Sequence, residues 1–123
     1  MTKLVIRIDF EPSGSSLGPS MIQLLETLQK EGSIRKAAKA LSISYRKAWL
    51  LIQQMQKTFT GPVVLAEAGG YEGGSTQLTE LGLTLLKHYR SVDSCCLEGT
   101  RKDLEALAAL VRHDAPPRRR ERG

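Results

Sequence analysis

The segment from Ser33 to Gln56, SIRKAAKALSISYRKAWLLIQQMQ, constrains the fold of this chain more than any other segment. Apolar residues recur there at helical spacing in two stripes. The stripes comprise Ile34, Ala37, Ala38 and Leu41, and then Ala48, Leu51, Ile52 and Met55. Between them, Ser42-Ile43-Ser44 predicts a tight turn in which Ile43 fills the corner and Ser44 caps the second helix. Because small side chains let two helices cross closely, the pattern predicts a helix-turn-helix.

Basic side chains are concentrated in the same segment. Between Glu31 and Glu67 there are six Lys or Arg residues and no Asp or Glu. The six are Arg35, Lys36, Lys39, Arg46, Lys47 and Lys57. An acid-free surface concentrates positive potential where a phosphate backbone can lie, whereas an ordinary solvated helix usually mixes the two signs. The charge pattern therefore favours a DNA-binding surface over a merely solvated face.

Composition bounds the remaining possibilities. A chain of 123 residues, 41% of them hydrophobic, can form one domain with a modest core. The adjacent Cys95 and Cys96 suit neither a disulfide framework nor a metal site, and we expect no cofactor. The isolated His88 and His113 form no catalytic grouping, so we do not expect an enzyme. The chain has no apolar run long enough for a membrane span and does not open with a signal peptide, so we expect a cytoplasmic protein.

The positive charge is unevenly distributed along the chain. Residues 112–123 hold five Arg residues against Asp114 and Glu121, which is a net +3 of the total +5. That segment contains two prolines and almost no apolar residues, so we expect a disordered basic tail. The domain itself should span residues 1–111.

Shorter elements are expected on both sides of the helix-turn-helix. Lys3–Phe10 alternates as a strand, residues 11–19 read as a loop, and a helix over Met21–Lys30 should be capped by Ser20 and ended by Gly32. Pro62–Ala66 and Thr76–Thr79 predict two short strands around a glycine-rich tip, which is a wing-like hairpin. The glycines do not form a phosphate-binding loop, because no Lys-Ser/Thr pair follows them.

A long helical pattern follows Thr79, its predicted cap, with Gly99 as a possible break. Its apolar stripe exceeds what a small domain can cover, so we expect a homodimer in preference to a helix that folds back on its own domain, with His88 on the exposed face. The predicted interface residues are Leu81, Leu85, Tyr89, Val92, Leu104 and Leu107. The expected fold is mainly α with a small β wing: a winged helix-turn-helix with a long C-terminal dimerisation helix.

These motifs together resemble a known family. GSIRKAAKALSISYRKAW, the glycine-rich wing and QLTELGLTLLKHY are similar to the N-terminal domain of the ModE family of molybdate-responsive regulators, over roughly Leu4 to Ala109. The N-terminal strand and the Ser-Tyr opening of the second helix favour this family over the related LysR-type regulators. The resemblance implies a dimeric winged helix-turn-helix that binds a palindromic operator in double-stranded DNA and controls molybdenum transport or molybdenum-enzyme genes.

Two features depart from the family pattern. Full-length members join this domain to C-terminal molybdate-binding domains, which these residues do not include, so molybdate binding is doubtful. The wing carries Glu67, Tyr71 and Glu72 where such wings often carry basic residues. These departures suit an alternative: a dimeric winged-helix interaction module that pairs with another regulator and has lost specific DNA binding.

If the second helix lies in a major groove with its first turn nearest the bases, the side chains that contact DNA can be predicted. Arg46 and Lys47 are expected to reach guanine edges or phosphates, while Trp49 is expected to pack into the buried side. The full set of predicted DNA-binding residues is Arg35, Lys36, Lys39, Ser44, Tyr45, Arg46, Lys47 and Gln53.

Overall fold

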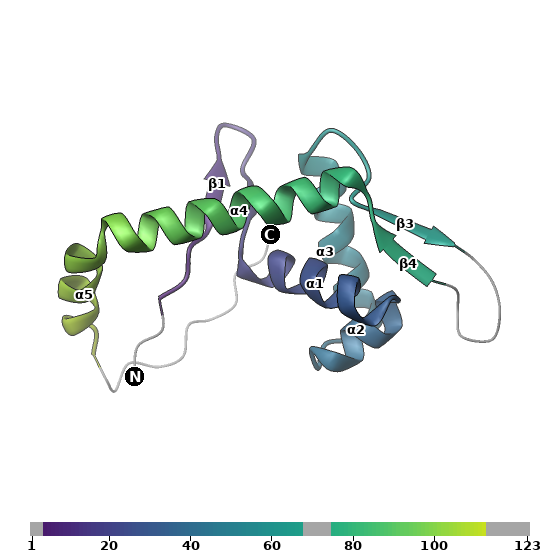
Figure 1. Cartoon of the computed structure of the whole chain (residues 1–123), viewed down its shortest axis with the longest axis horizontal. Helices are drawn as coiled ribbons and strands as arrows, with labels where there is room; N and C mark the ends of the chain where they lie inside the picture. Colours follow the sequence, from purple (N-terminus) through teal and green to yellow (C-terminus); the bar gives the residue numbers. More distant parts are fainter. Residues whose placement is uncertain (1–3, 68–74, 113–123) are drawn as a thin grey trace.

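A computed structural model describes residues 4–67 and 75–112. In chain order the elements are β1 (Ile8–Phe10), β2 (Ser15–Leu17), α1 (Pro19–Glu31), α2 (Ile34–Ala40), α3 (Tyr45–Thr58), β3 (Val64–Glu67), β4 (Ser75–Leu78), α4 (Glu80–Gly99) and α5 (Arg101–Ala109). Helices α1 to α3 and the β3–β4 hairpin gather at one end of α4, and α5 lies at its other end (Figure 1). This arrangement is the predicted winged helix-turn-helix.

The N-terminal segment forms a hairpin in place of one strand and a loop. β1 pairs with β2 in antiparallel register, with Ile8 opposite Leu17 and Phe10 opposite Ser15. The predicted strand is therefore too long, and the predicted loop contains a second strand. Gly14, at a φ of 82°, allows the tight turn, and its N–H donates to the carbonyl of Phe10. The turn returns the chain so that Leu17 enters the core.

Helix α1 begins earlier than the predicted helix. Its N-cap is Gly18, which makes no side-chain cap hydrogen bond, and Pro19 occupies the first turn. Ser20 is therefore not the cap, because the preset φ of proline already suits the first helical position. The predicted end is confirmed: Gly32 adopts a left-handed φ of 83°, and its N–H donates to the carbonyl of Leu28 at 2.8 Å.

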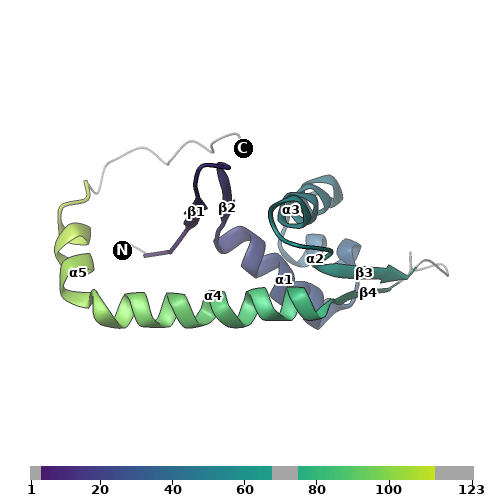
Figure 2. The same ribbon diagram turned by 90° about the horizontal axis from the view of Figure 1, so that it is seen from above.

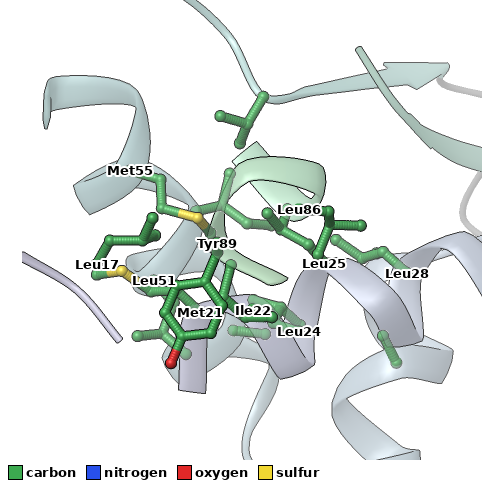
Figure 3. Packing of buried hydrophobic residues seen from close by; sticks show 14 of the residues in the cluster. Leu17, Met21, Ile22, Leu24, Leu25, Leu28, Leu51, Met55, Leu86 and Tyr89 are labelled. Carbon is green, nitrogen blue, oxygen red and sulfur yellow. The ribbon is translucent and has the colours of Figure 1, made fainter. Parts of the chain in front are cut away.

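The core lies where α1 meets α3 and α4. Leu24, Leu25 and Leu28 of α1 are fully buried. They pack in one cluster with Met55 of α3 and Leu86 of α4 (Figure 3). Burying these side chains supplies the main driving force for folding, at about 1.5–3 kcal/mol for each large apolar side chain. The core thus fixes the rotation of α3 about its own axis, and with it the face that α3 turns outward.

The predicted wing is present as β3 and β4, which pair antiparallel from Val64 opposite Leu78 to Glu67 opposite Ser75. Its glycine-rich tip, with the predicted Tyr71 and Glu72, lies outside the described residues. The N–H of Thr76 donates to the carbonyl of Gly32 at 2.8 Å. This bond joins the hairpin to the end of α1, beside the helix-turn-helix.

Helices α4 and α5 divide the long helical segment. The Thr79 side chain caps α4 as predicted, accepting from the N–H of Gly82. α4 ends at Gly99, and the Thr100 hydroxyl donates to the carbonyl of Cys96. α5 then leaves the axis of α4, as Figure 2 shows. Within the described residues, no helix is both long and apolar enough to cross a membrane.

Candidate nucleic-acid interface

Helices α2 and α3 pack against each other, and both carry buried alanines. Ala37 and Ala48 have no exposed surface, and Ala38 is also buried. Larger side chains at these three positions would push the two helices apart. The structure shows that α2 packs against α3 and that these alanines are buried, as the predicted close crossing requires.

The turn between α2 and α3 is closed by backbone and side-chain hydrogen bonds. Ser42 adopts a left-handed φ of 58°, a conformation that many turns assign to glycine. The N–H of Ile43 donates to the carbonyl of Ala38 at 3.0 Å, and the Ile43 side chain packs against the core. The Ser44 hydroxyl accepts from the N–H of Lys47 at 3.0 Å, which confirms the predicted N-cap of α3.

The predicted DNA-binding side chains lie in two groups. Arg35, Lys36 and Lys39 are exposed on α2. Ser44, Tyr45 and Arg46 are exposed where α3 begins, while Lys47 and Gln53 are half-buried. The structure brings Ser44 to Lys47 together at the start of α3, places Gln53 about two turns further along the same helix, and leaves the α2 residues on a separate helix.

The basic side chains of α2 and α3 are not neutralised by any residue that the structure describes. The ion pairs among the described residues join Arg7 to Asp9, Glu26 to Arg90, and Glu98 to Arg101. None of these pairs involves α2 or α3, which contain no Asp or Glu. Their positive charge is therefore available to an anionic partner.

Trp49 corrects one expectation from the sequence. It does not pack into the core: its exposed fraction is 45%, and the neighbouring Leu50 is also exposed. The inward face of α3 is already occupied by Ala48, Ile52 and Met55, and a residue one position after Ala48 points about 100° away from it. The i, i+3 spacing from Arg46 to Trp49 was the signal that both lie on the outer side of α3.

The apolar stripe of α4 and α5 is partly used within the chain. Tyr89 is buried, and its hydroxyl donates to the backbone carbonyl of Ile6. Leu81 and Leu85 are half-buried against the same core. Val92 and, in α5, Leu107 are exposed, whereas Leu104 is half-buried. Only the C-terminal part of the stripe therefore keeps a large free apolar surface.

Comparisons with known proteins agree with this fold. The chain is 38% identical over 93 residues to a molybdenum transport protein ModE of Azotobacter vinelandii, covering 75% of this chain and 34% of that protein. It is 37% identical over 73 residues to the transcriptional regulator ModE of Haemophilus influenzae, covering 59% of this chain and 29% of that one. The chain is therefore similar in sequence to ModE regulators over part of their length. No family model matches the chain.

A solved structure shows the same fold. The protein chain in a crystal structure of a CbnR_DBD–DNA complex superposes on this chain with a TM-score of 0.53. The match covers 73% of this chain and 95% of that chain at 19% identity. This chain spans about a third of the length of the curated relatives that it matches.

Proposed function

We propose that this protein is a sequence-specific DNA-binding transcriptional regulator. The observation that carries the proposal is α3, which buries one face in the core and exposes Arg46 on the other, within an acid-free segment. In helix-turn-helix proteins the second helix enters the major groove with its first residues nearest the bases. Arg46 and Lys47 then reach guanine edges or phosphates, and Ser44, Tyr45 and Gln53 add hydrogen bonds.

Helix α2 holds the DNA backbone in this proposal. Arg35, Lys36 and Lys39 are exposed on a helix that packs directly against α3. Phosphate contacts of this kind fix the register of the protein on the duplex without reading sequence. They also make binding salt-dependent, because each neutralised phosphate releases counterions.

The functional unit proposed is a homodimer on a palindromic operator. Val92 of α4 and Leu107 of α5 are exposed, and Leu107 has an exposed fraction of 61%. Apolar surface of this kind, extending beyond the core of the domain, favours burial against a second copy. Two-fold symmetry of the protein then requires two-fold symmetry of its DNA site.

The names of the relatives suggest which genes this protein regulates. Two of them are called a molybdenum transport protein and a molybdenum-pterin-binding protein, the latter MopB of Rhodobacter capsulatus. MopB is 34% identical over 84 residues, covering 68% of this chain and 31% of MopB. We propose genes for molybdenum transport or molybdenum enzymes as targets, and we assign molybdate binding to none of the described residues.

One experiment tests this function. The protein is mixed with a pool of genomic DNA fragments at low and at moderate salt, bound fragments are sequenced, and the protein's mass in solution is measured. Enrichment of a palindrome by a dimer is the expected result. Binding that is salt-sensitive but blind to sequence would overturn specific regulation and favour the interaction module that pairs with another regulator.

A further inference from the structure

Three large apolar side chains lie exposed near the start of α3. The exposed fractions are 52% for Tyr45, 45% for Trp49 and 39% for Leu50. α3 is held by a buried face on the opposite side, where Ala48 and Met55 have no exposed surface. The core therefore prevents α3 from turning Trp49 inward. An exposed cluster of this size near a helix terminus indicates a contact with a partner.

The apolar cluster shares its face with the charged and polar residues of the proposed DNA contact. Arg46, Trp49 and Gln53 follow one another at i, i+3 and i+7, so they line one side of the helix. A surface hollow of about 280 Å³ is lined by Tyr45, Arg46 and Trp49. A group that packs against the indole ring therefore lies beside the guanidinium group.

The partner of this mixed surface is defined by its chemistry. The basic residues of α2 and α3, with no acidic residue between Glu31 and Glu67, favour a polyanion. In the major groove the edges of guanine, cytosine and adenine are polar, and thymine alone presents an apolar group, its C5-methyl. Within that groove, the thymine methyl is thus the group that complements an exposed indole beside an arginine.

We propose that Trp49, flanked by Tyr45 and Leu50, packs against thymine C5-methyl groups and makes thymine the preferred base at those operator positions. This inference rests on the proposed function and deepens it. Arg46 and Trp49 make different contacts. The guanidinium group of Arg46 hydrogen-bonds guanine or binds phosphate, and the indole ring of Trp49 packs against the methyl group. The sequence preference of the protein then includes A·T pairs that are recognised through the thymine methyl group.

The test uses a duplex that the wild-type protein itself selects from a random pool. Each thymine is replaced in turn by deoxyuridine, which removes only the methyl group and keeps base pairing. At one or more positions, the affinity of the wild-type protein for the duplex should fall roughly fourfold. This factor corresponds to the free energy gained by burying one methyl group. The Trp49→Ala protein should bind the thymine and uracil duplexes equally. Arg46→Ala is the matched control: it binds more weakly overall but remains sensitive to uracil.

The outcomes separate this inference from the proposed function. If the pool yields no enriched sequence, both fail. If the wild-type protein binds a selected sequence and is indifferent to every uracil, the thymine contact is overturned while the function stands. A Trp49→Ala protein that loses the same factor on both duplexes also overturns the methyl contact, because the loss is then independent of the base. The wild-type measurement needs no variant, so it decides the question even if Trp49→Ala folds poorly.

Discussion

Gly82, in the first turn of α4, lies directly against the backbone carbonyl oxygen of Val63. A methyl group on Gly82 would come within 2.5 Å of that oxygen. The same carbonyl accepts the N–H of Thr79 at 3.0 Å. α4 can therefore begin at this place, next to the wing, only because position 82 has no side chain.

Gly82→Ala should destabilise the protein by about 1–3 kcal/mol, because the added methyl group forces backbone to move. Urea unfolding followed by circular dichroism measures this free energy. Gly99→Ala is the matched control at the other end of α4, where an added methyl group meets nothing within 4 Å. The control should be neutral or slightly stabilising, since alanine is the better helix former. Equal stability of both variants would contradict the close approach.

Arg46→Ala should weaken binding to the selected operator by about 1–3 kcal/mol. The guanidinium group is exposed on α3 and has no described ion-pair partner, so its loss leaves the fold unchanged. Fluorescence anisotropy with a labelled duplex measures the affinity. Arg101→Ala, an exposed arginine on α5 at the far end of α4, should bind as the wild type does (Figure 1). Unchanged affinity of Arg46→Ala would remove this residue from the interface.

Ser44→Asp should separate folding from DNA binding. Aspartate caps a helix as well as serine does, so the unfolding free energy should change by less than about 0.5 kcal/mol. The added negative charge, at the end of α3 nearest the DNA, should repel phosphate and lower the affinity. Ser44→Asn keeps the cap without the charge and is the control. If Ser44→Asp binds the operator as tightly as Ser44→Asn, this end of α3 does not face DNA.

Tyr89→Phe should reduce stability by about 1 kcal/mol, because the carbonyl of Ile6 loses its hydrogen bond. Tyr45→Phe is the matched control: Tyr45 is exposed, and its hydroxyl makes no hydrogen bond to a residue that the structure describes. Its unfolding free energy should stay within about 0.5 kcal/mol of the wild type. Thermal and urea unfolding at neutral pH compare the two variants. Equal losses in the two variants would show that the Tyr89 hydroxyl stabilises the fold no more than the exposed Tyr45 hydroxyl does.

The stability of the protein should also depend on pH through Tyr89. Burial, and secondarily the Asp93 carboxylate, raise the pKa of Tyr89 above its ordinary value of 10.0. The folded protein thus holds the phenolic proton more tightly than the unfolded chain. The contribution of the neutral Tyr89 side chain to the free energy of unfolding is complete below about pH 10. This contribution declines as the pH rises further. Between about pH 9 and about pH 11, the wild type should therefore lose more stability than Tyr89→Phe, and parallel curves would contradict the shift.

Val92→Lys should shift the protein from dimer to monomer, because an unpaired ammonium group is costly to bury in an apolar interface. Analytical ultracentrifugation over a range of protein concentrations measures the change. Leu83→Lys is the control: Leu83 is also exposed on α4, but nine residues earlier, about two and a half turns away and so on the opposite side. A dimer that survives Val92→Lys and not Leu83→Lys would place the interface on the other face.

Elements governed by neighbouring residues were predictable. The caps at Ser44 and Thr79 and the end of α1 at Gly32 each depend on hydrogen bonds within four residues along the chain. The burial of the alanines of α2 and α3 follows from helical periodicity in the same way. The hairpin of β1 and β2 was missed, because strands of three residues show too little alternation to be recognised.

The sequence by itself therefore determined the helix-turn-helix, its caps and its acid-free charge, since these arise from local periodicity and composition. Only the tertiary structure decided which large side chains of each helix are covered. Tyr89 is buried in the core, and its hydroxyl finds its hydrogen-bond acceptor at Ile6, 83 residues earlier in the chain. Trp49 is exposed because α1 packs on the other side of α3. Side chains at the margin of an apolar stripe are buried or exposed according to which distant segment lies beside them, and periodicity carries no information about that segment.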